Sequence, residues 1–150
     1  MADRGFTLIE MAIVIAIGVI LVWIGVPLVQ AQMDRARIAQ AVTEIGDMST
    51  KIRARIRSKG ALPDSLDEAG FGGRVDPWGN AYQYLNLFDS KGNGVARKDK
   101  KLAPLNSDFD LYSVGADGQT AASLVNSASR DDIVRARDGG FIGLASDFDP

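Results

Sequence analysis

The sequence predicts an α+β protein in which one long N-terminal helix, apolar in its first half, packs on a small antiparallel sheet. Three observations support this prediction. An apolar segment lies near the N-terminus, a stripe of apolar residues at helical spacing follows it, and short segments of alternating polarity fill the second half. A chain of 150 residues leaves room for one small domain beside such a helix.

The apolar segment runs from Phe6 to Val29, and Glu10 is its only charged residue. It is long enough to cross about 30 Å of hydrocarbon with some tilt. A cleaved secretory signal is the main alternative, but its hydrophobic region normally spans only about 7 to 15 residues and ends in a small-residue cleavage site. Arginines flank the segment on both sides, so charge does not fix its orientation in a membrane.

The helix is predicted to continue far beyond Pro27. Apolar residues recur at spacings of 4, 3, 7 and 4, as on one face of a helix. This stripe consists of Ile38, Val42, Ile45, Ile52 and Ile56. Ser49 occupies the position that the stripe skips. Because Gly60 and Pro63 are stop signals, we expect one helix from about residue 6 to Ser58.

The second half of the chain has the pattern of a small domain. Residues 62–70 are predicted to form a short helix that ends at a glycine. Residues 82–88 and 109–114 alternate and are predicted strands, and residues 141–144 are a shorter third element. A glycine-rich turn and a charged loop occupy residues 89–101.

Composition disfavours several classes of function. The chain has no cysteine and no histidine, so it lacks the usual zinc ligands and the Ser-His and Cys-His nucleophile pairs. We therefore expect no enzyme. A net charge of −2 gives no general attraction to nucleic acid, and the basic residues 51–59 are interpreted as a solvated helix end. No nucleic-acid partner is expected.

The sequence Gly-Phe-Thr-Leu-Ile-Glu, residues 5–10, resembles the processing site of the type IV pilin and type II secretion pseudopilin families. In these families a prepilin peptidase cuts after the glycine, here Gly5, and the new N-terminus, here Phe6, is N-methylated. Pro27 also lies where the families place a proline in the membrane helix. The resemblance therefore implies a type IV pilin-like fold.

The resemblance also implies a division of the chain. Residues 1–5 would be the leader peptide, residues 6–30 the transmembrane and assembly helix, and residues 31–150 the periplasmic globular domain. A carboxylate inside a bilayer costs about 2.5 to 3.5 kcal/mol, so Glu10 needs a partner or a task. In a filament, Glu10 of one subunit would neutralise the new amine of its neighbour. The alternative is that Glu10 reaches water at the headgroup level.

Two further segments, residues 76–84 and residues 110–119, resemble the major pseudopilins of type II secretion, as does Asp131-Asp132-Ile133. In that family the loop after the second strand binds calcium, which takes oxygen ligands. The implied ligands are the side chains of Asp117, Asp131 and Asp132 and the backbone carbonyl of Val114.

This sequence departs from the family pattern around those ligands. The loop that contains residues 120–129 is longer than in the family, and the tryptophan that follows the Asp pair in the family is missing. The alternative interpretation is that Asp117-Gly118 is only a turn, and that Asp131 and Asp132 only cap the next segment.

These observations leave three candidate functions. The first is a secretion pseudopilin that polymerises with itself and works with minor pseudopilins, an inner-membrane assembly platform and prepilin peptidase. It would be a single-pass inner-membrane protein before assembly. The second is a type IV pilin for adhesion, motility or DNA uptake. The third is a membrane-tethered enzyme or binding domain, which the missing histidines and cysteines disfavour.

Overall fold

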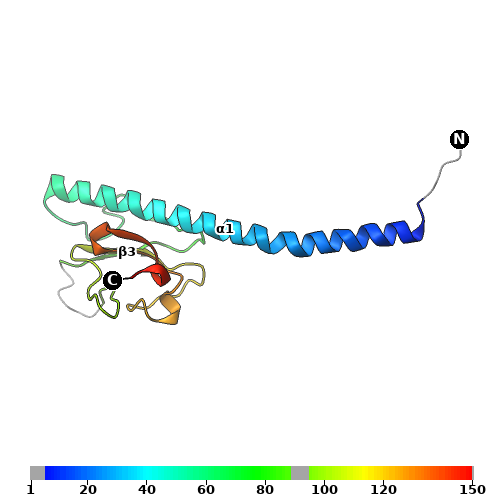
Figure 1. The fold of residues 1–150 in the computed structure, drawn as a ribbon. Coiled ribbons are helices and arrows are strands. Elements are labelled where there is room, and N and C mark those ends of the chain that lie inside the picture. The colour runs from blue at the N-terminus through cyan, green and yellow to red at the C-terminus, as the bar shows by residue number, and fades with distance from the viewer. Residues whose placement is uncertain (1–5, 89–94, 150) are drawn as a thin grey trace. The chain divides into compact units, whose positions relative to one another are not determined.

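The computed structural model describes residues 6–88 and 95–149. Its elements are α1 (Leu8–Lys59), β1 (Gln83–Asn86), β2 (Phe109–Ser113), η1 (Ser127–Ser129), β3 (Ile133–Ala136), η2 (Arg137–Gly139), β4 (Phe141–Leu144) and η3 (Ala145–Asp147) (Figure 1). The chain divides into two compact units, residues 1–36 and residues 37–150, and α1 contributes to both. We call them the N-terminal unit and the C-terminal unit. The predicted single long helix is confirmed.

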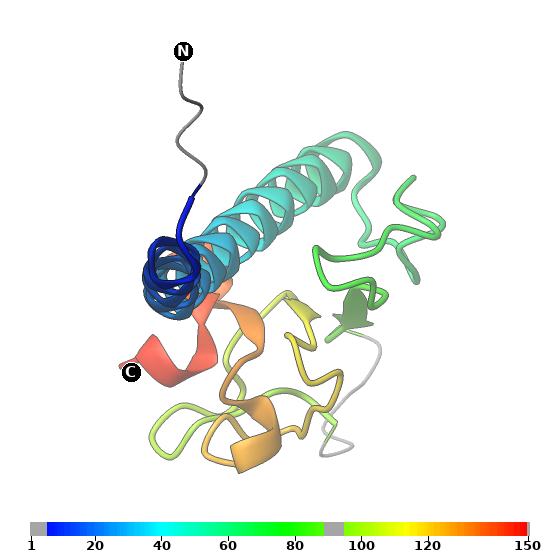
Figure 2. The ribbon, with the colours of Figure 1, turned by 90° about the vertical axis from the view of Figure 1, so that its right-hand side faces the viewer.

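A four-stranded sheet with the order β1-β2-β3-β4 lies at the centre of the C-terminal unit, and all its neighbouring strands are antiparallel. The part of α1 from residue 37 onward lies along one face of this sheet (Figures 1 and 2). The predicted stripe supplies the contact, because Ile45 and Ile52 are buried there against Phe109 and Ile133. The α+β class is therefore confirmed.

The opposite face of the sheet packs on a second apolar cluster. Strand β3 serves both faces, since Ile133 belongs to the helix side and Val134 to the other side. Loop residues complete the second cluster, whose buried members are Leu105, Leu124, Val134, Ala136 and Ala145. The loops are therefore part of the hydrophobic core.

The predicted strands are found in shortened form as β1 and β2, and the third element is β4. One prediction of local structure was wrong, and one strand was missed. Residues 62–70 form turns and no helix, because the hydrogen bonds there do not keep the helical span: Ala69 N donates to Ser65 O, whereas Gly70 N donates to Asp67 O. Strand β3 was not predicted, and all four of its residues are buried.

Candidate functional site

The first turn of α1 is closed by a reciprocal pair of polar side chains. Thr7 donates to Glu10 Oε2 from its backbone N, at 2.8 Å, and from its Oγ1, at 2.9 Å. The backbone N of Glu10 donates back to Thr7 Oγ1 at 3.3 Å. This arrangement is a capping box, with Thr7 as the N-cap and Glu10 three residues later. The Thr-x-x-Glu spacing was visible in the sequence, but its capping role was not recognised.

The capping box gives the Glu10 carboxylate partners within its own chain. Within the described residues, only one of its oxygens accepts a hydrogen bond, and the residue is exposed. Phe6, the predicted mature N-terminus, is 76% exposed and lies immediately before Thr7. Gly5, on the other side of the predicted cleavage point, lies outside the described residues. A new amine on Phe6 would therefore arise next to a carboxylate that still has an open oxygen.

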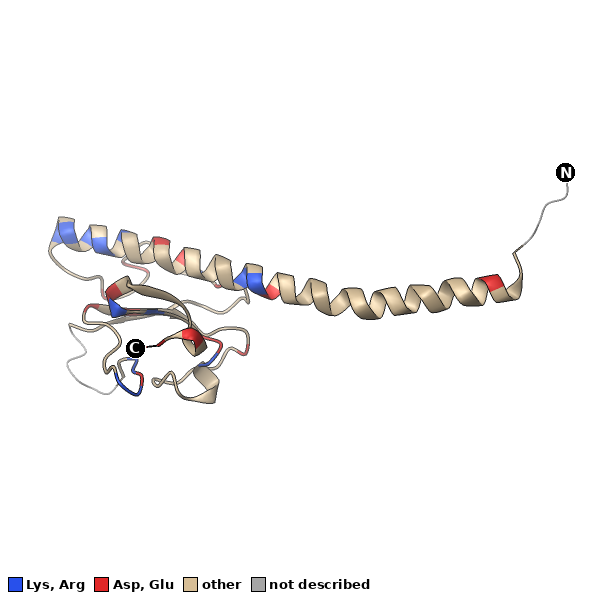
Figure 3. Ribbon diagram, in the orientation of Figure 1, with Lys and Arg blue, Asp and Glu red and all other residues tan. Residues whose placement is uncertain are grey.

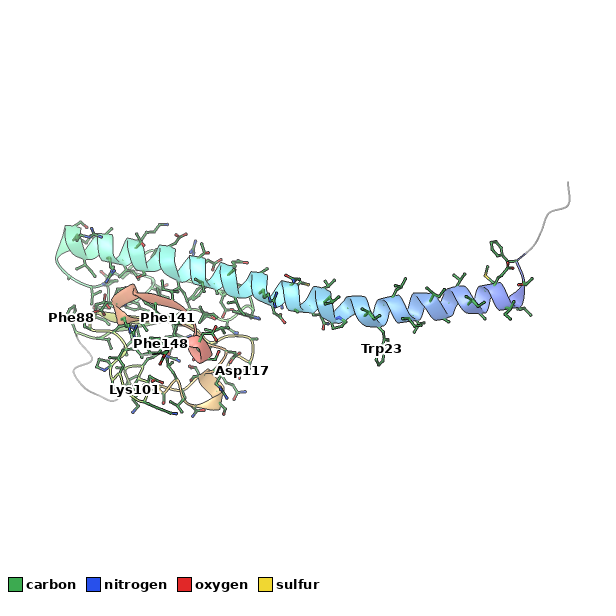
Figure 4. The ribbon with its side chains drawn as sticks, viewed as in Figure 1. Trp23, Phe88, Lys101, Asp117, Phe141 and Phe148 are labelled. Atoms are coloured by element: carbon green, nitrogen blue, oxygen red, sulfur yellow. The ribbon has the colours of Figure 1, made fainter. Side chains whose placement is uncertain are left out.

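Beyond Glu10, the α1 helix of the N-terminal unit has an apolar surface as far as Met33. Between Glu10 and Asp34, α1 carries no charged residue (Figure 3). Its large side chains point outward and are exposed, Trp23 by 82% (Figure 4). By length and composition this stretch qualifies as a candidate membrane span, and none of it is buried by the chain. These properties are consistent with membrane anchoring.

Pro27 lies inside α1 and does not end it. A proline has no N–H to donate, so the carbonyl of Trp23, four residues earlier, loses its helical partner. Pro27 therefore leaves one backbone acceptor unpaired by the helix ladder in the middle of the apolar surface. The structure describes its position but does not test its predicted role in assembly.

The four predicted calcium ligands have different surroundings. Val114 is buried directly after β2, whereas Asp117 is exposed on the loop that follows (Figure 4). Asp131 Oδ2 accepts a hydrogen bond from the backbone N of Asp117 at 3.0 Å, and Asp117 Oδ1 accepts one from Gln119 N at 2.8 Å. The carboxylates of Asp117 and Asp131 therefore each accept a hydrogen bond from a backbone N–H.

Asp132 is fully buried and pairs with an arginine that was not among the predicted residues. Its Oδ2 accepts from Arg97 Nη2 and, at 2.7 Å, from Thr120 Oγ1. Burial raises the pKa of Asp132, while the hydrogen bond from Thr120 and the charge of Arg97 oppose that shift. Across residues 6–88 and 95–149, no three acidic side chains come together as a possible metal site. As arranged here, the predicted ligand set does not fit one calcium ion, and calcium binding stays a prediction.

A second buried arginine connects the sheet to α1. Arg135 on β3 binds both oxygens of Asp108, at 2.7 and 2.8 Å, and its Nε donates to Ser49 Oγ at 2.9 Å. Its guanidinium also lies 4.0 Å from the ring centre of Phe109. Ser49 is the residue that interrupts the apolar stripe, so the polar position on the helix matches a polar partner on the sheet.

Comparison with known proteins places this geometry in a class. Residues 1–26 match the family described as the prokaryotic N-terminal methylation motif. The chain is 30% identical over 143 residues to the type II secretion system core protein G of Pseudomonas aeruginosa, which covers 81% of this chain and 89% of that protein. No solved structure matches the chain.

Two fimbrial proteins match shorter parts. The fimbrial protein of Moraxella nonliquefaciens is 38% identical over 71 residues, 47% of this chain and 46% of that protein. The fimbrial protein EcpB of Eikenella corrodens is 43% identical over 61 residues, 41% of this chain and 38% of that protein.

A methylation motif that leads into a long apolar helix, ahead of a small antiparallel sheet, defines a type IV pilin-like protein. Within that class, the extent of the match to core protein G decides the family. The chain belongs to the major pseudopilins of type II secretion systems, whose members are structural proteins.

Proposed function

We propose that the chain is a structural subunit of a secretion pseudopilus, without enzymatic activity, that is cut between Gly5 and Phe6 and polymerises through residues 6–30. The observation that carries this proposal is the apolar surface of α1. Its large side chains are exposed, and Glu10 is the only charged residue between Phe6 and Met33. A surface of this kind suits hydrocarbon before assembly and neighbouring helices after it.

The first turn of α1 suggests how assembly uses Glu10. Cleavage by prepilin peptidase creates an amine on Phe6, which methylation keeps positively charged. The amine of a neighbouring subunit then binds the Glu10 oxygen that the capping box leaves open. A charge-assisted hydrogen bond in a medium of low dielectric constant is stronger than the same contact in water. The ion pair therefore favours stacked helices over helices dispersed in lipid.

The remaining parts of the proposal follow from the family. Before assembly the protein is a single-pass protein of the bacterial inner membrane, with residues 31–150 in the periplasm. Its partners are other copies of the chain, minor pseudopilins, the assembly platform and the peptidase. Growth of the filament drives protein export across the outer membrane.

A type IV pilus is the second candidate, supported by the two fimbrial relatives. Their matches cover less than half of this chain, whereas core protein G covers most of it. Deletion of the gene separates the two functions. Loss of secreted proteins with surface fibres intact supports secretion, and loss of surface fibres with secretion intact would reverse the assignment.

Mass spectrometry of the protein from its native membrane tests the processing step. We expect residues 1–5 to be absent and one methyl group on Phe6. Gly5→Asp should leave the leader in place. Gly18→Ala is the matched control, because an added Cβ there meets nothing within 4 Å. An intact opening methionine in the wild-type protein from assembled filaments contradicts the proposal.

A further inference from the structure

We propose that the guanidinium of Arg97 is the built-in cation of the loops around Asp132, in place of the calcium ion that the family resemblance predicts there. The C-terminal unit would then fold without calcium. This inference concerns the C-terminal unit alone and does not depend on the proposed filament. It rests on contacts among Arg97, Asp132 and the loop of residues 120–129.

Arg97 is as deeply buried as a core residue, and both its backbone and its side chain are hydrogen-bonded. Its side chain is 4% exposed, and that of Asp132 is 0% exposed. The backbone N of Arg97 donates to Asp110 Oδ2 at 2.8 Å, and its carbonyl accepts from Leu105 N, also at 2.8 Å. Its guanidinium lies 4.1 Å from the ring centre of Tyr112. The positive charge is therefore fixed against the Asp132 carboxylate by backbone and side-chain contacts together.

The long loop supplies a second partner to the same pair. Arg97 Nη1 donates to Thr120 Oγ1 at 2.7 Å, and that hydroxyl donates onward to Asp132 Oδ2 at 2.7 Å. Thr120 begins the stretch of residues 120–129, which the family resemblance marks as a longer loop. The departure from the family pattern thus brings a hydrogen-bonding group to the carboxylate that was predicted to bind calcium.

Backbone hydrogen bonds join the Arg97 segment to this loop. Lys98 N donates to Ala122 O at 2.9 Å, and Leu124 N donates to Lys98 O at 2.9 Å. The loop is also closed on itself, because Ser129 Oγ accepts from Ala121 N and donates to Ala121 O. The loop and the residue that carries the cation therefore form one structural unit.

The unpaired atoms of the network belong to the same ion pair. Among the described side chains, two buried polar atoms have no hydrogen-bond partner, Arg97 Nε and Asp132 Oδ1. A calcium ion at Asp132 would also meet the guanidinium, and like charges in a medium of low dielectric constant repel strongly.

A tethered cation has a different thermodynamic consequence from a bound one. An ion that binds only the folded state stabilises it in proportion to the logarithm of its concentration, whereas Arg97 is present at every calcium concentration. Removing either partner of a buried ion pair leaves an uncompensated charge and is strongly destabilising. Folding of this domain should therefore be insensitive to calcium and sensitive to Arg97.

Thermal unfolding of the full chain in detergent tests the inference. Fluorescence of Trp78, in a Trp23→Phe background, reports on the C-terminal unit, because Trp78 packs against its core. The midpoint is measured with chelator and with calcium at about 10 mM, above the weakest protein affinities of about 1 mM. We expect the same midpoint in both. A midpoint that rises by several degrees in calcium overturns the proposal.

Substitution supplies the second arm. Arg97→Ala should lower the midpoint by at least about 10 °C, as expected for a buried charge left alone. Arg130→Ala, which removes an exposed arginine from the neighbouring loop, should change it little. An Arg97→Ala midpoint equal to the wild type overturns the proposal. If Arg97→Ala does not fold, the comparison of the wild-type midpoint in chelator and in calcium decides. A wild-type midpoint that rises in calcium overturns the proposal.

Discussion

The two units of this protein differ in how their charged side chains find partners. In the C-terminal unit the buried charges are enclosed and paired within the chain, as Arg97 is with Asp132 and Arg135 with Asp108. In the N-terminal unit a carboxylate precedes an exposed apolar surface, and only its own first turn contacts it. The C-terminal unit pairs these buried charges within the chain, whereas the apolar surface of the N-terminal unit is not buried by the chain. Interactions missing from a single chain are the ones that assembly can supply.

The difference predicts that mutations separate folding from assembly. Changes in the first turn of α1 should affect filaments without affecting the C-terminal unit. Changes at the buried arginines should lower the stability of that unit first. Effects that cross from one unit to the other would contradict this division.

The largest effect on assembly is expected from Glu10→Ala. We expect assembled protein to fall at least about tenfold, because an intramembrane amine left without its partner costs about 2.5 to 3.5 kcal/mol. Assembly can be measured by disulfide cross-linking through Ile17→Cys, since the chain has no cysteine of its own. The unfolding midpoint should not change.

Asp47→Asn is the control for Glu10→Ala. It also removes a negative charge from α1, but from an exposed position in the C-terminal unit. Cross-linking equal to wild type in both variants would show that the Glu10 charge has no role in assembly.

Among the changes in this series, Arg135→Met should have the largest effect on the stability of the C-terminal unit. Replacement removes the hydrogen bonds that Arg135 donates to Asp108, Ser49 and the carbonyl of Phe109. Breaking a buried pair of this kind costs about 3 to 5 kcal/mol of unfolding free energy, measurable by urea denaturation. Assembly of any folded fraction should be unchanged.

Arg53→Ala is the matched control for Arg135→Met. Arg53 contacts the same carboxylate at 3.8 Å, but its side chain is 44% exposed. Exposed pairs contribute only about 0 to 1 kcal/mol. Equal losses for the two arginines would mean that burial does not set the strength of these ion pairs.

A smaller loss is expected from Ser49→Ala. The change removes the acceptor for Arg135 Nε inside the core and leaves a buried donor unpaired, at a cost of about 1 to 3 kcal/mol. Ser58→Ala, at the exposed end of the same helix, should change the free energy of unfolding by no more than about 0.5 kcal/mol. An unchanged free energy of unfolding in Ser49→Ala would mean that the hydrogen bond from Arg135 Nε to Ser49 Oγ does not stabilise the C-terminal unit.

The contrast between the units also explains which predictions succeeded. The long helix could be predicted because apolar periodicity and stop signals are local properties of the sequence. Strand β3 could not, because Arg135 is buried only through partners that lie 27 and 86 residues away, at Asp108 and Ser49. The Arg97–Asp132 pair is likewise 35 residues apart. From sequence alone, an arginine is predicted to be exposed unless its partner far along the chain is known.

The same reasoning applies to the candidate sites. The processing motif was identified from contiguous residues, and the capping box of Thr7 and Glu10 was readable at a spacing of three. The calcium ligands were inferred by resemblance. In the structure, Asp132 pairs with Arg97, a residue that was not predicted to belong to the site.

The smallest predicted effect is a pH dependence at the β3–β4 turn. Burial alone would raise the pKa of Asp138, but hydrogen bonds from the backbone N and Oγ of Ser107 outweigh it and hold the pKa below its ordinary value of 3.8. A lowered folded-state pKa contributes stability above the ordinary value, and that stability is lost as pH falls through the folded-state value. Wild type should therefore be more stable than Asp138→Asn at neutral pH.

This advantage should shrink as the pH is taken below about 4 and vanish in stronger acid, because both chains are then neutral at this position. Asp138 has a left-handed backbone, φ 53°, which asparagine tolerates, so the substitution changes charge with little added strain. Urea unfolding of both chains across this range measures the difference, with Asp47→Asn as the control for net charge. A difference that stays constant with pH would mean that Ser107 stabilises the turn without favouring the ionised carboxylate.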